Sequence, residues 1–435
     1  MPIYDPWLIH KPIDSYILFW RRACALSALV FLIMQLTGGV VRWVLDMVGA
    51  AVLAYIPNLM MLGCVFFLLM YEIIFQQIKV GALFFIGLLG FSMMVGFYNI
   101  GGLSQVIFGL WVLTPFLFGL TCAPAITLNL QFRQFILYAL MIIAGGGVVI
   151  HSVAELPWVG LTYSVGGVEL EGAREWQTTG GSQRLSGFAR SSFDVAGQVI
   201  LAAALLSLQL SKGWQRFFLW GVCTYAVSLS TSKGILLALL MTIFASEALI
   251  RKKTWWLQTI FSIGIFWLFI PPLMGWTMDW TEAARTDLEN PLYGSFIDRM
   301  NDMWPRALEL VTEFGHPILG RGLGGIGVPV SIYEPALANA GDNVFVYCFV
   351  LLGYFSIPLF ILGITMIMKM CRHLERADVR DVIVLAVIIN WYGGVSNILE
   401  HAVLSFAMGI LCRYLAMMFI GKIDNNPKNN PALMT

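Results

Sequence analysis

Two arginines and a carboxylate stand close together in the segment Arg184-Leu-Ser-Gly-Phe-Ala-Arg-Ser-Ser-Phe-Asp194, at the start of an apolar run. A guanidinium group presents a rigid fork of donors that matches phosphate oxygens, and it stays charged at any relevant pH. Arg184 and Arg190 are therefore candidates for binding a phosphate group. A second interpretation stays open, in which they are ordinary loop arginines that pair with Glu171 and Glu175 or extend toward the membrane surface.

A carboxylate and an amide stand together at Asp342-Asn343, which follow Gly341 and directly precede the apolar run that starts at Val344. Asp342 is expected at the N-terminus of a helix, where capping is the default explanation of an aspartate. The functional alternative is a general base that takes a proton from an attacking hydroxyl. A carboxylate at the partly dry edge of a membrane can have its pKa raised far enough for that role.

Further cationic candidates lie in two other polar segments. Lys233 closes the tight turn that starts at Ser228 between two apolar runs. Its ammonium group could meet a lipid phosphate at the mouth of a helix, or extend to the membrane interface like any lysine. Arg299 and Arg321 lie in a later segment, where they are further candidates for phosphate binding. The lone His316 in that segment is a candidate for substrate binding.

Other kinds of site lack the residues that they require. The glycine-rich run 320–327 has no expected strand before it and no Lys-Ser/Thr pair after it, which favours a flexible loop or close backbone packing over a nucleotide phosphate loop. The five histidines show no metal-binding spacing, so neither a metal nor a cofactor is expected. The net charge of +1, without a basic tract, indicates no nucleic-acid partner. All seven cysteines lie in or beside apolar runs, which indicates no disulfide framework.

The elements that must position these residues are membrane helices. The 435-residue chain is 59% hydrophobic and 12% charged, with a mean hydropathy of +0.79. Apolar runs of about 20 residues span a bilayer. The sequence thus predicts an all-α polytopic membrane protein, a single membrane domain over residues 1–435. About twelve transmembrane helices are expected, at 23–41, 47–71, 80–98, 102–120, 134–153, 195–211, 216–230, 234–250, 256–275, 343–369, 381–398 and 402–420.

Two long polar loops separate these runs, at 154–194 and 276–342. In the second loop, apolar residues recur at a helical period from Tyr293 to Phe314, which predicts an amphipathic helix interrupted near Pro305. This helix is expected either on the membrane surface or over a cavity mouth, or packed on other loops.

Lys and Arg in the short connections predict the orientation. Most of them fall on the side of the N-terminus, whereas the short loops of the other side hold only Arg42 and Lys233. An even number of spans then puts both termini in the cytoplasm. Both long loops face outward, into the periplasm if the membrane is a Gram-negative inner membrane.

Four segments, taken together, resemble the O-antigen ligase and Wzy-type polysaccharide polymerase superfamily. They are Arg184-x-x-Gly187-Phe188 after an outer loop, Ser230-Thr-Ser-Lys233 at the next outer turn, His316-Pro-Ile-Leu-Gly320-x-Gly322 at the end of a large outer loop, and Asp342-Asn343 opening a span that contains Gly353. The order and topology match over residues 180–360, while the N-terminal third matches only as generic membrane helices.

The resemblance implies binding of an undecaprenyl-diphosphate-linked glycan at the outer face of the inner membrane. It further implies transfer of that glycan to an acceptor hydroxyl without a nucleotide sugar or a metal. Arg184 and Lys233 would hold the diphosphate and stabilise the leaving group. Asp342, helped by Asn343, would occupy the position of the family's histidine and activate the acceptor.

Three departures from the family pattern bear on the expected reaction. Lys233 stands where the family usually has Arg, Asp342 replaces His, and Phe193-Asp194 replaces a common Pro-Asn. Ligases that use lipid A core typically keep the His. We therefore expect a polymerase of O-antigen or exopolysaccharide repeat units, with Arg190, Arg299 and Arg321 also handling the diphosphate.

Two alternative functions stay open. The nearer one is an O-antigen or protein glycan ligase, and the more distant one is a transporter or flippase of lipid-linked sugars. The expected partners of a polymerase are membrane lipid, a chain-length regulator and the flippase of the same pathway.

Overall fold

The structure is a computed structural model that describes residues 11–74, 80–126, 130–165, 168–174, 176–177, 183–230, 233–287 and 294–419. The described residues are mostly helical, which confirms the predicted helical membrane class. Their only strands form two small antiparallel hairpins.

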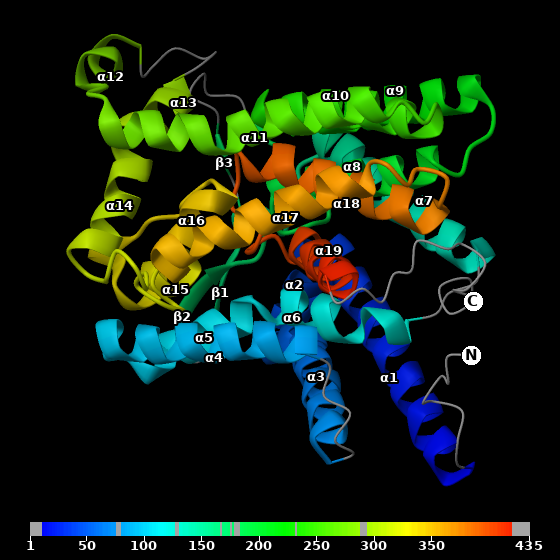
Figure 1. Cartoon of the computed structure of the whole chain (residues 1–435), viewed down its shortest axis with the longest axis horizontal. Helices are drawn as coiled ribbons and strands as arrows, with labels where there is room; N and C mark the ends of the chain where they lie inside the picture. Colours follow the sequence, from blue (N-terminus) through cyan, green and yellow to red (C-terminus); the bar gives the residue numbers. More distant parts are fainter. Residues whose placement is uncertain are drawn as a thin grey trace.

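A layered bundle occupies the upper part of Figure 1 and surrounds one short buried helix. That helix is α8 (Ser192–Ser207), which contacts α7 (Leu130–Val153), α9 (Gly213–Leu229), α10 (Lys233–Ile250), α18 (Ala377–Gly393) and α19 (Ala402–Phe419). Its many alanine and glycine residues let these neighbours approach closely, and nearly all of its side chains are buried. The outer layer includes α11 (Thr254–Thr277) and α17 (Ser356–Met370), which also pack on α18.

A second group of helices carries the N-terminal third. It contains α1 (Lys11–Leu36), α3 (Ile56–Ile74), α4 (Val80–Ile100), α5 (Leu103–Val112) and α6 (Thr114–Cys122), with α2 (Gly38–Met47), η1 (Ala51–Tyr55) and η2 (Ala123–Ala125) between them. α1 and α3 project from the bundle in Figure 1. α6 lies against α19, where Gly119 and Gly409 bring the two backbones together. Small residues at such contacts are typical of helices packed in a membrane.

The number of membrane-spanning helices is smaller than predicted. Among the described residues, six helices are long and apolar enough to cross a membrane, or seven if the pair Leu103–Val112 and Thr114–Ala125, bent by 52°, forms one span. The expectation of about twelve spans was therefore wrong for these residues. Several predicted spans correspond to shorter helices: α8 has 16 residues, about 24 Å at 1.5 Å per residue, which is less than the hydrocarbon core.

The segment predicted as loop 154–194 forms the connection between α7 and α8 and carries the two hairpins. β1 (Thr162–Val165) pairs with β2 (Val168–Glu171), and β3 (Trp176–Gln177) pairs with β4 (Gln183–Arg184). β4 ends at Arg184, eight positions before α8 begins.

The segment predicted as loop 276–342 forms the connection between α11 and α16 (Val344–Leu352) and is largely helical. It contains α12 (Thr281–Asp287), α13 (Gly294–Asp298), the π-helical turn η3 (Arg299–Met303), α14 (Trp304–Thr312), α15 (Val328–Tyr333) and η4 (Pro335–Leu337), and η5 (Gly353–Phe355) follows α16. The predicted amphipathic helix is therefore present, although Tyr293 lies outside the described residues. It packs on two helices that were predicted as spans rather than on other loops: Trp304 is buried, and α14 contacts α11 and α16.

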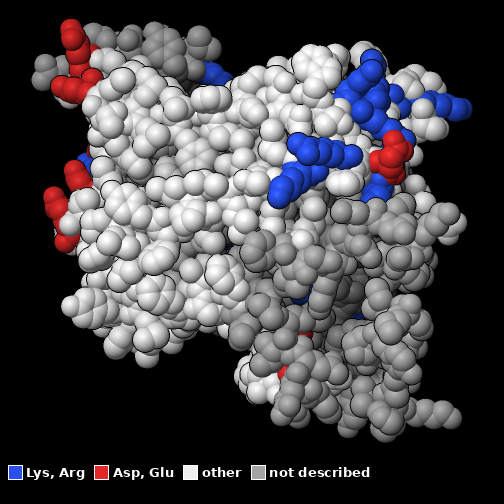
Figure 2. Space-filling model, viewed as in Figure 1, with Lys and Arg blue, Asp and Glu red and all other residues white. Residues whose placement is uncertain are grey.

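Charge is distributed unevenly along the molecule. Figure 2 shows acidic side chains at the left edge, beside α12 and α14, and basic side chains toward the right edge, around the ends of α9 and α18. Ion pairs join the elements of the basic end: Arg216 and Arg251 both contact Glu247, and Lys252 contacts Glu375. The surface between the two ends is mostly uncharged in this view.

Candidate functional site

Three residues that the sequence singled out come together where the two long connections meet. The Arg299 Nη2 atom lies 2.7 Å from Asp342 Oδ2, and Arg299 Nη1 donates to the backbone oxygen of Ser295. Arg184 lies within electrostatic range of both: burial and the charge of Arg299 lower the pKa of Arg184, and Asp342 acts in the opposite direction. We call Arg184 and Arg299 the first arginine group.

The backbone before α16 explains why Asp342 is available to Arg299. Asp342 has a φ of 32°, in the left-handed region that few residues other than glycine adopt. The helix cap is Asn343, whose Oδ1 accepts from the amides of Phe345 and Val346 while Nδ2 donates to the Leu268 and Gly394 oxygens. Capping therefore belongs to Asn343 and leaves the Asp342 carboxylate to the ion pair.

A π-helical turn positions the other partner. Arg299 opens η3, directly before α14. Trp304 fixes this turn, because its Nε1 donates to the oxygen of Gly341 and its own oxygen accepts from Trp276 Nε1. Such π turns inside helices occur frequently at functional sites.

A second arginine group, Arg42, Arg174 and Arg190, comes from three segments that backbone hydrogen bonds hold together. The Arg174 amide donates to the Arg190 oxygen, and Gly39 at the start of α2 donates to the Phe188 oxygen. Burial and the charge of Arg190 lower the pKa of both Arg42 and Arg174. The Nε atoms of Arg42 and Arg190 are buried and have no hydrogen-bond partner among the described residues. This group is a concentrated positive charge suited to an anion.

Gly187 of the predicted motif has a structural reason to be glycine. Its φ is 59°, and a Cβ there would lie 2.7 Å from the backbone nitrogen of Val148 in α7. The loop between β4 and α8 can therefore press against α7, which brings Arg184 and Arg190 close to the start of α8.

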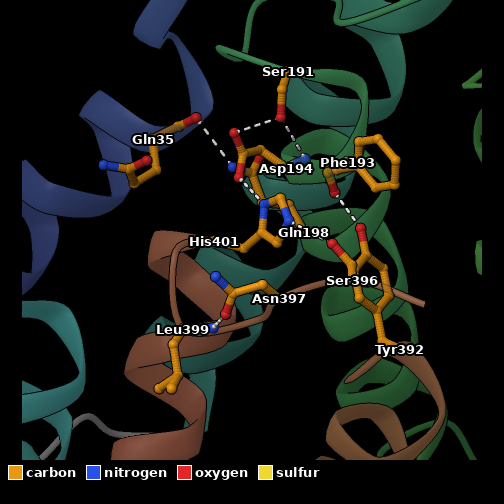
Figure 3. A network of polar contacts seen from close by, with 10 residues as sticks. All are labelled: Gln35, Ser191, Phe193, Asp194, Gln198, Tyr392, Ser396, Asn397, Leu399 and His401. Carbon is orange, nitrogen blue, oxygen red and sulfur yellow. Dashed lines mark hydrogen bonds and ion pairs between the residues drawn. The ribbon is translucent and has the colours of Figure 1, made fainter. Parts of the chain in front are cut away.

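A polar network joins α8 to the connection between α18 and α19 (Figure 3). His401 Nδ1 lies 2.9 Å from Asp194 Oδ1, and His401 Nε2 lies 2.8 Å from Ser396 Oγ. Ser191 caps α8 and donates to the second oxygen of Asp194 at 2.7 Å. Burial alone would raise the pKa of Asp194, but the hydrogen bonds from His401 and Ser191 outweigh it and hold the pKa below its ordinary value.

The ring of Phe193 links this network to the first arginine group. The Arg184 guanidinium carbon lies 5.6 Å from the centroid of the ring, and the His401 imidazole stacks on it at 5.9 Å. The backbone oxygen of Phe193 accepts a hydrogen bond from the Tyr392 hydroxyl. Arg184 and His401 therefore contact the same aromatic side chain.

Two predicted site residues lie apart from this cluster of contacts. Arg321 is 1% exposed, and its Nη2 donates to both oxygens of Glu334 while Nη1 donates to the Gly325 oxygen. His316 is exposed and its Nδ1 accepts from the amide of Ile318. Both side chains have clear structural partners, so neither enters the site that we propose below.

Lys233 is the exposed first residue of α10. The next residue, Gly234, is so close to Val395 that a Cβ would lie 2.6 Å from its Cγ1. Lys233 thus lies beside the connection that carries Ser396 and His401. Residues 231 and 232 of its predicted motif lie outside the described residues.

Sequence reasoning missed Arg42, Arg174, Ser396 and His401 as site residues, and it named Asp194 without giving it a role. Arg42 served only as an orientation signal in the sequence analysis. No local pattern connects them, because the fold joins Asp194 to His401 across 207 positions of the chain.

Comparisons with known proteins identify no relative. The chain matches no protein family, no curated protein and no solved structure.

Proposed function

We propose that the chain is a membrane glycosyltransferase that joins undecaprenyl-diphosphate-linked oligosaccharide repeat units into O-antigen or exopolysaccharide. The reaction would occur at the periplasmic face of a bacterial inner membrane, with both termini in the cytoplasm. The observation that carries the proposal is the convergence of Arg184 and Arg299 beside Asp342.

The chemistry of a diphosphate leaving group accounts for the first arginine group. As the bond between the anomeric carbon and the phosphate oxygen breaks, negative charge grows on the diphosphate. Preorganised guanidinium groups in a site with little water stabilise that charge more than water would. Arg184 has no ion-pair partner of its own in the described part of the chain, so its charge is available to the substrate.

Asp342 and the second arginine group complete the proposed binding surface. The Asp342 carboxylate orients Arg299 toward the diphosphate, and its role as the base that activates the acceptor stays a prediction from the resemblance. Asn343 would support it by fixing the start of α16. Arg190, together with Arg42 and Arg174, offers further charge for the phosphates or for acidic sugars. Lys233 would approach from the neighbouring start of α10.

The charge distribution supports the proposed orientation. The basic end holds the short connections rich in Lys and Arg, and α13 and α14 of the connection that carries the Arg299–Asp342 pair lie away from that end (Figures 1 and 2). Basic connections are retained on the cytoplasmic side of bacterial membranes. This arrangement would put the first arginine group on the periplasmic side, where lipid-linked glycans are polymerised.

Replacement of Arg184 by Ala tests the proposal in cells that make the polymer. We expect polymer to disappear while the amount of the variant in the membrane is unchanged. Arg306→Ala is the matched control, because Arg306 is exposed in α14 and pairs with Asp302 one turn away. Polymer of unchanged length in the Arg184→Ala strain would contradict the proposal.

A further inference from the structure

His401 has the contacts that a proton acceptor requires, and it shares the ring of Phe193 with Arg184. Asp194, with a lowered pKa, is a carboxylate and can only accept hydrogen bonds, so the His401 proton belongs on Nδ1. Nε2 then carries the lone pair, and it accepts from the Ser396 hydroxyl. A carboxylate that fixes the tautomer of a histidine also stabilises the imidazolium that forms when Nε2 takes a proton.

The packing around the imidazole fixes its plane. Phe193 stacks on one face at an interplanar angle of 25°, and Tyr392 meets the ring edge-on at 75°. Figure 3 shows His401 between α8 and the connection before α19, with Asp194 and Ser396 pointing to its two nitrogens. The ring therefore cannot turn without breaking two hydrogen bonds and a stacking contact.

The exposure of the two side chains decides which one a substrate can reach. The His401 side chain is 17% exposed, whereas Ser396 is 2% exposed. Ser396 is therefore too enclosed to act as a nucleophile toward a glycan. In the resting state its hydroxyl donates a hydrogen bond to His401 Nε2, and a hydroxyl of the substrate can replace it as the donor.

We propose that His401, in place of Asp342, whose carboxylate pairs with Arg299, is the general base of the glycan transfer and that Asp194 is its positioning residue. This inference rests on the proposed function. His401 Nε2 takes the proton of the acceptor hydroxyl as that oxygen bonds to the anomeric carbon. The bond from that carbon to the phosphate oxygen breaks, and its electron pair leaves with the diphosphate held by Arg184 and Arg299. The proton stays on the imidazolium beside the Asp194 carboxylate until solvent removes it.

The other ionisable groups around His401 are compatible with this role. Asp194 faces it from α8, Tyr392 from α18 and Glu400 from the preceding position. Arg174 interacts electrostatically with both carboxylates, and Arg190 interacts with Asp194. Burial raises the pKa of Glu400, which favours its neutral form. Asp194 is thus the direct ionic partner of the imidazole.

The test measures initial rates of glycosidic bond formation by the purified full-length chain with a lipid-diphosphate-linked repeat unit. His401→Ala and His401→Gln should each lose about 100-fold or more in rate, the usual contribution of a general base. Asp194→Asn should lose rate as well, because the amide no longer holds the required tautomer. His373→Ala, at an exposed histidine between α17 and α18, should keep the wild-type rate and serves as the control.

Chemical rescue with imidazole distinguishes a histidine that acts as a general base from one that only stabilises the fold. Imidazole added to His401→Ala should restore part of the rate, and the restored rate should rise with pH as the neutral fraction of imidazole grows. His401→Gln keeps much of the volume of the side chain and covers the case in which the Ala variant does not fold.

The outcomes of these experiments distinguish failure of the His401 proposal from failure of the proposed function. A wild-type chain that forms product, together with a folded His401→Gln variant of similar rate, would overturn this inference alone. Loss of rate in His401→Ala that imidazole cannot restore would also overturn it and indicate a structural role for the histidine. A wild-type chain that forms no product would contradict the proposed function instead.

Discussion

At the scale of the residue, Asp342 combines an unfavourable backbone with a functional side chain. Its φ of 32° is one of only two positive values among the described residues other than glycine. Aspartate tolerates this region better than most residues, yet it is still strained there. A strained residue that holds an arginine of the candidate site is better explained by function than by stability.

Substitutions at Asp342 should therefore separate stability from activity. We predict that Asp342→Gly is more stable than Asp342→Ala by about 1 kcal/mol, because only glycine removes the left-handed penalty. Both variants should lose polymer formation, since neither orients Arg299. Thermal unfolding of the two purified variants checks the first statement and product analysis the second. Equal stability would show that the backbone at this position is not strained.

Glu400 offers a prediction about pH. Its Oε1 accepts from the Val328 amide and the Tyr347 hydroxyl, and burial raises its pKa. The folded chain then binds this proton more tightly than the unfolded chain. The associated stability is present at low pH and is lost as pH rises from the ordinary glutamate range through the raised pKa.

Glu400→Gln should remove that loss, because an amide oxygen keeps both hydrogen bonds and does not ionise. The Tm of the variant minus the Tm of the wild type should therefore increase as pH rises from about 4 to about 8. Glu313→Gln, at an exposed position after α14, is the control. Parallel Tm curves for Glu400→Gln and the wild type would mean that Glu400 does not titrate in this interval.

The sequence predicted the types of residue in the site better than their partners. Arg184, Arg299 and Asp342 stood out because charge beside apolar runs needs a reason, and the fold brings these three together. Which of Asp342 and Asn343 caps α16 depends on one backbone angle, which no residue pattern records. Arg321 has the same chemistry as Arg184, but Glu334 neutralises it in the fold.

At the scale of the element, the position of α2 determines where Arg42 lies. Gly39 has no room for a side chain: a Cβ would lie 2.6 Å from Trp158 Cδ1 and 3.2 Å from the Ala189 oxygen. The close approach of α2 to the loop before α8 brings Arg42 to Arg190.

We predict that Gly39→Ala destabilises the chain by about 1–3 kcal/mol, the usual cost of overpacking, and lowers activity by moving Arg42. Gly63→Ala in α3 is the matched control, because a Cβ there meets nothing within 4 Å. Unfolding midpoints of both variants in the same detergent give the comparison. A neutral Gly39→Ala would indicate that α2 can shift without affecting the second arginine group.

Helices were easier to predict than membrane spans. Apolar runs correctly indicated α7, α10 and α11, which are long enough to cross a bilayer. They could not show that α8 has only 16 residues, or that α5 and α6 meet at an angle of 52°. An apolar composition shows only that a segment is buried in apolar surroundings. The interior of a protein provides such surroundings as well as a lipid bilayer does.

At the scale of the whole molecule, the uneven charge predicts an orientation that chemical labelling can check. α11 ends at Thr277, directly before the acidic end at α12, so residues 251–253 before its start lie at the opposite end. A cysteine in place of exposed Arg306 should react with a membrane-impermeant maleimide in intact cells. A cysteine in place of exposed Lys253 should react only after permeabilisation. The reverse pattern would invert the proposed orientation and exclude a periplasmic first arginine group.

The most direct test of the central claim uses the purified chain in detergent, a lipid-diphosphate-linked repeat unit and EDTA, with the products resolved by size. We predict a ladder of lengthening glycans from the wild type and none from Arg184→Ala. Transfer that occurs only after addition of lipid A core would show a ligase instead of a polymerase. If the wild-type chain forms no glycosidic bond with any acceptor, the account is contradicted, and movement of lipid-linked sugar across vesicles becomes the activity to measure.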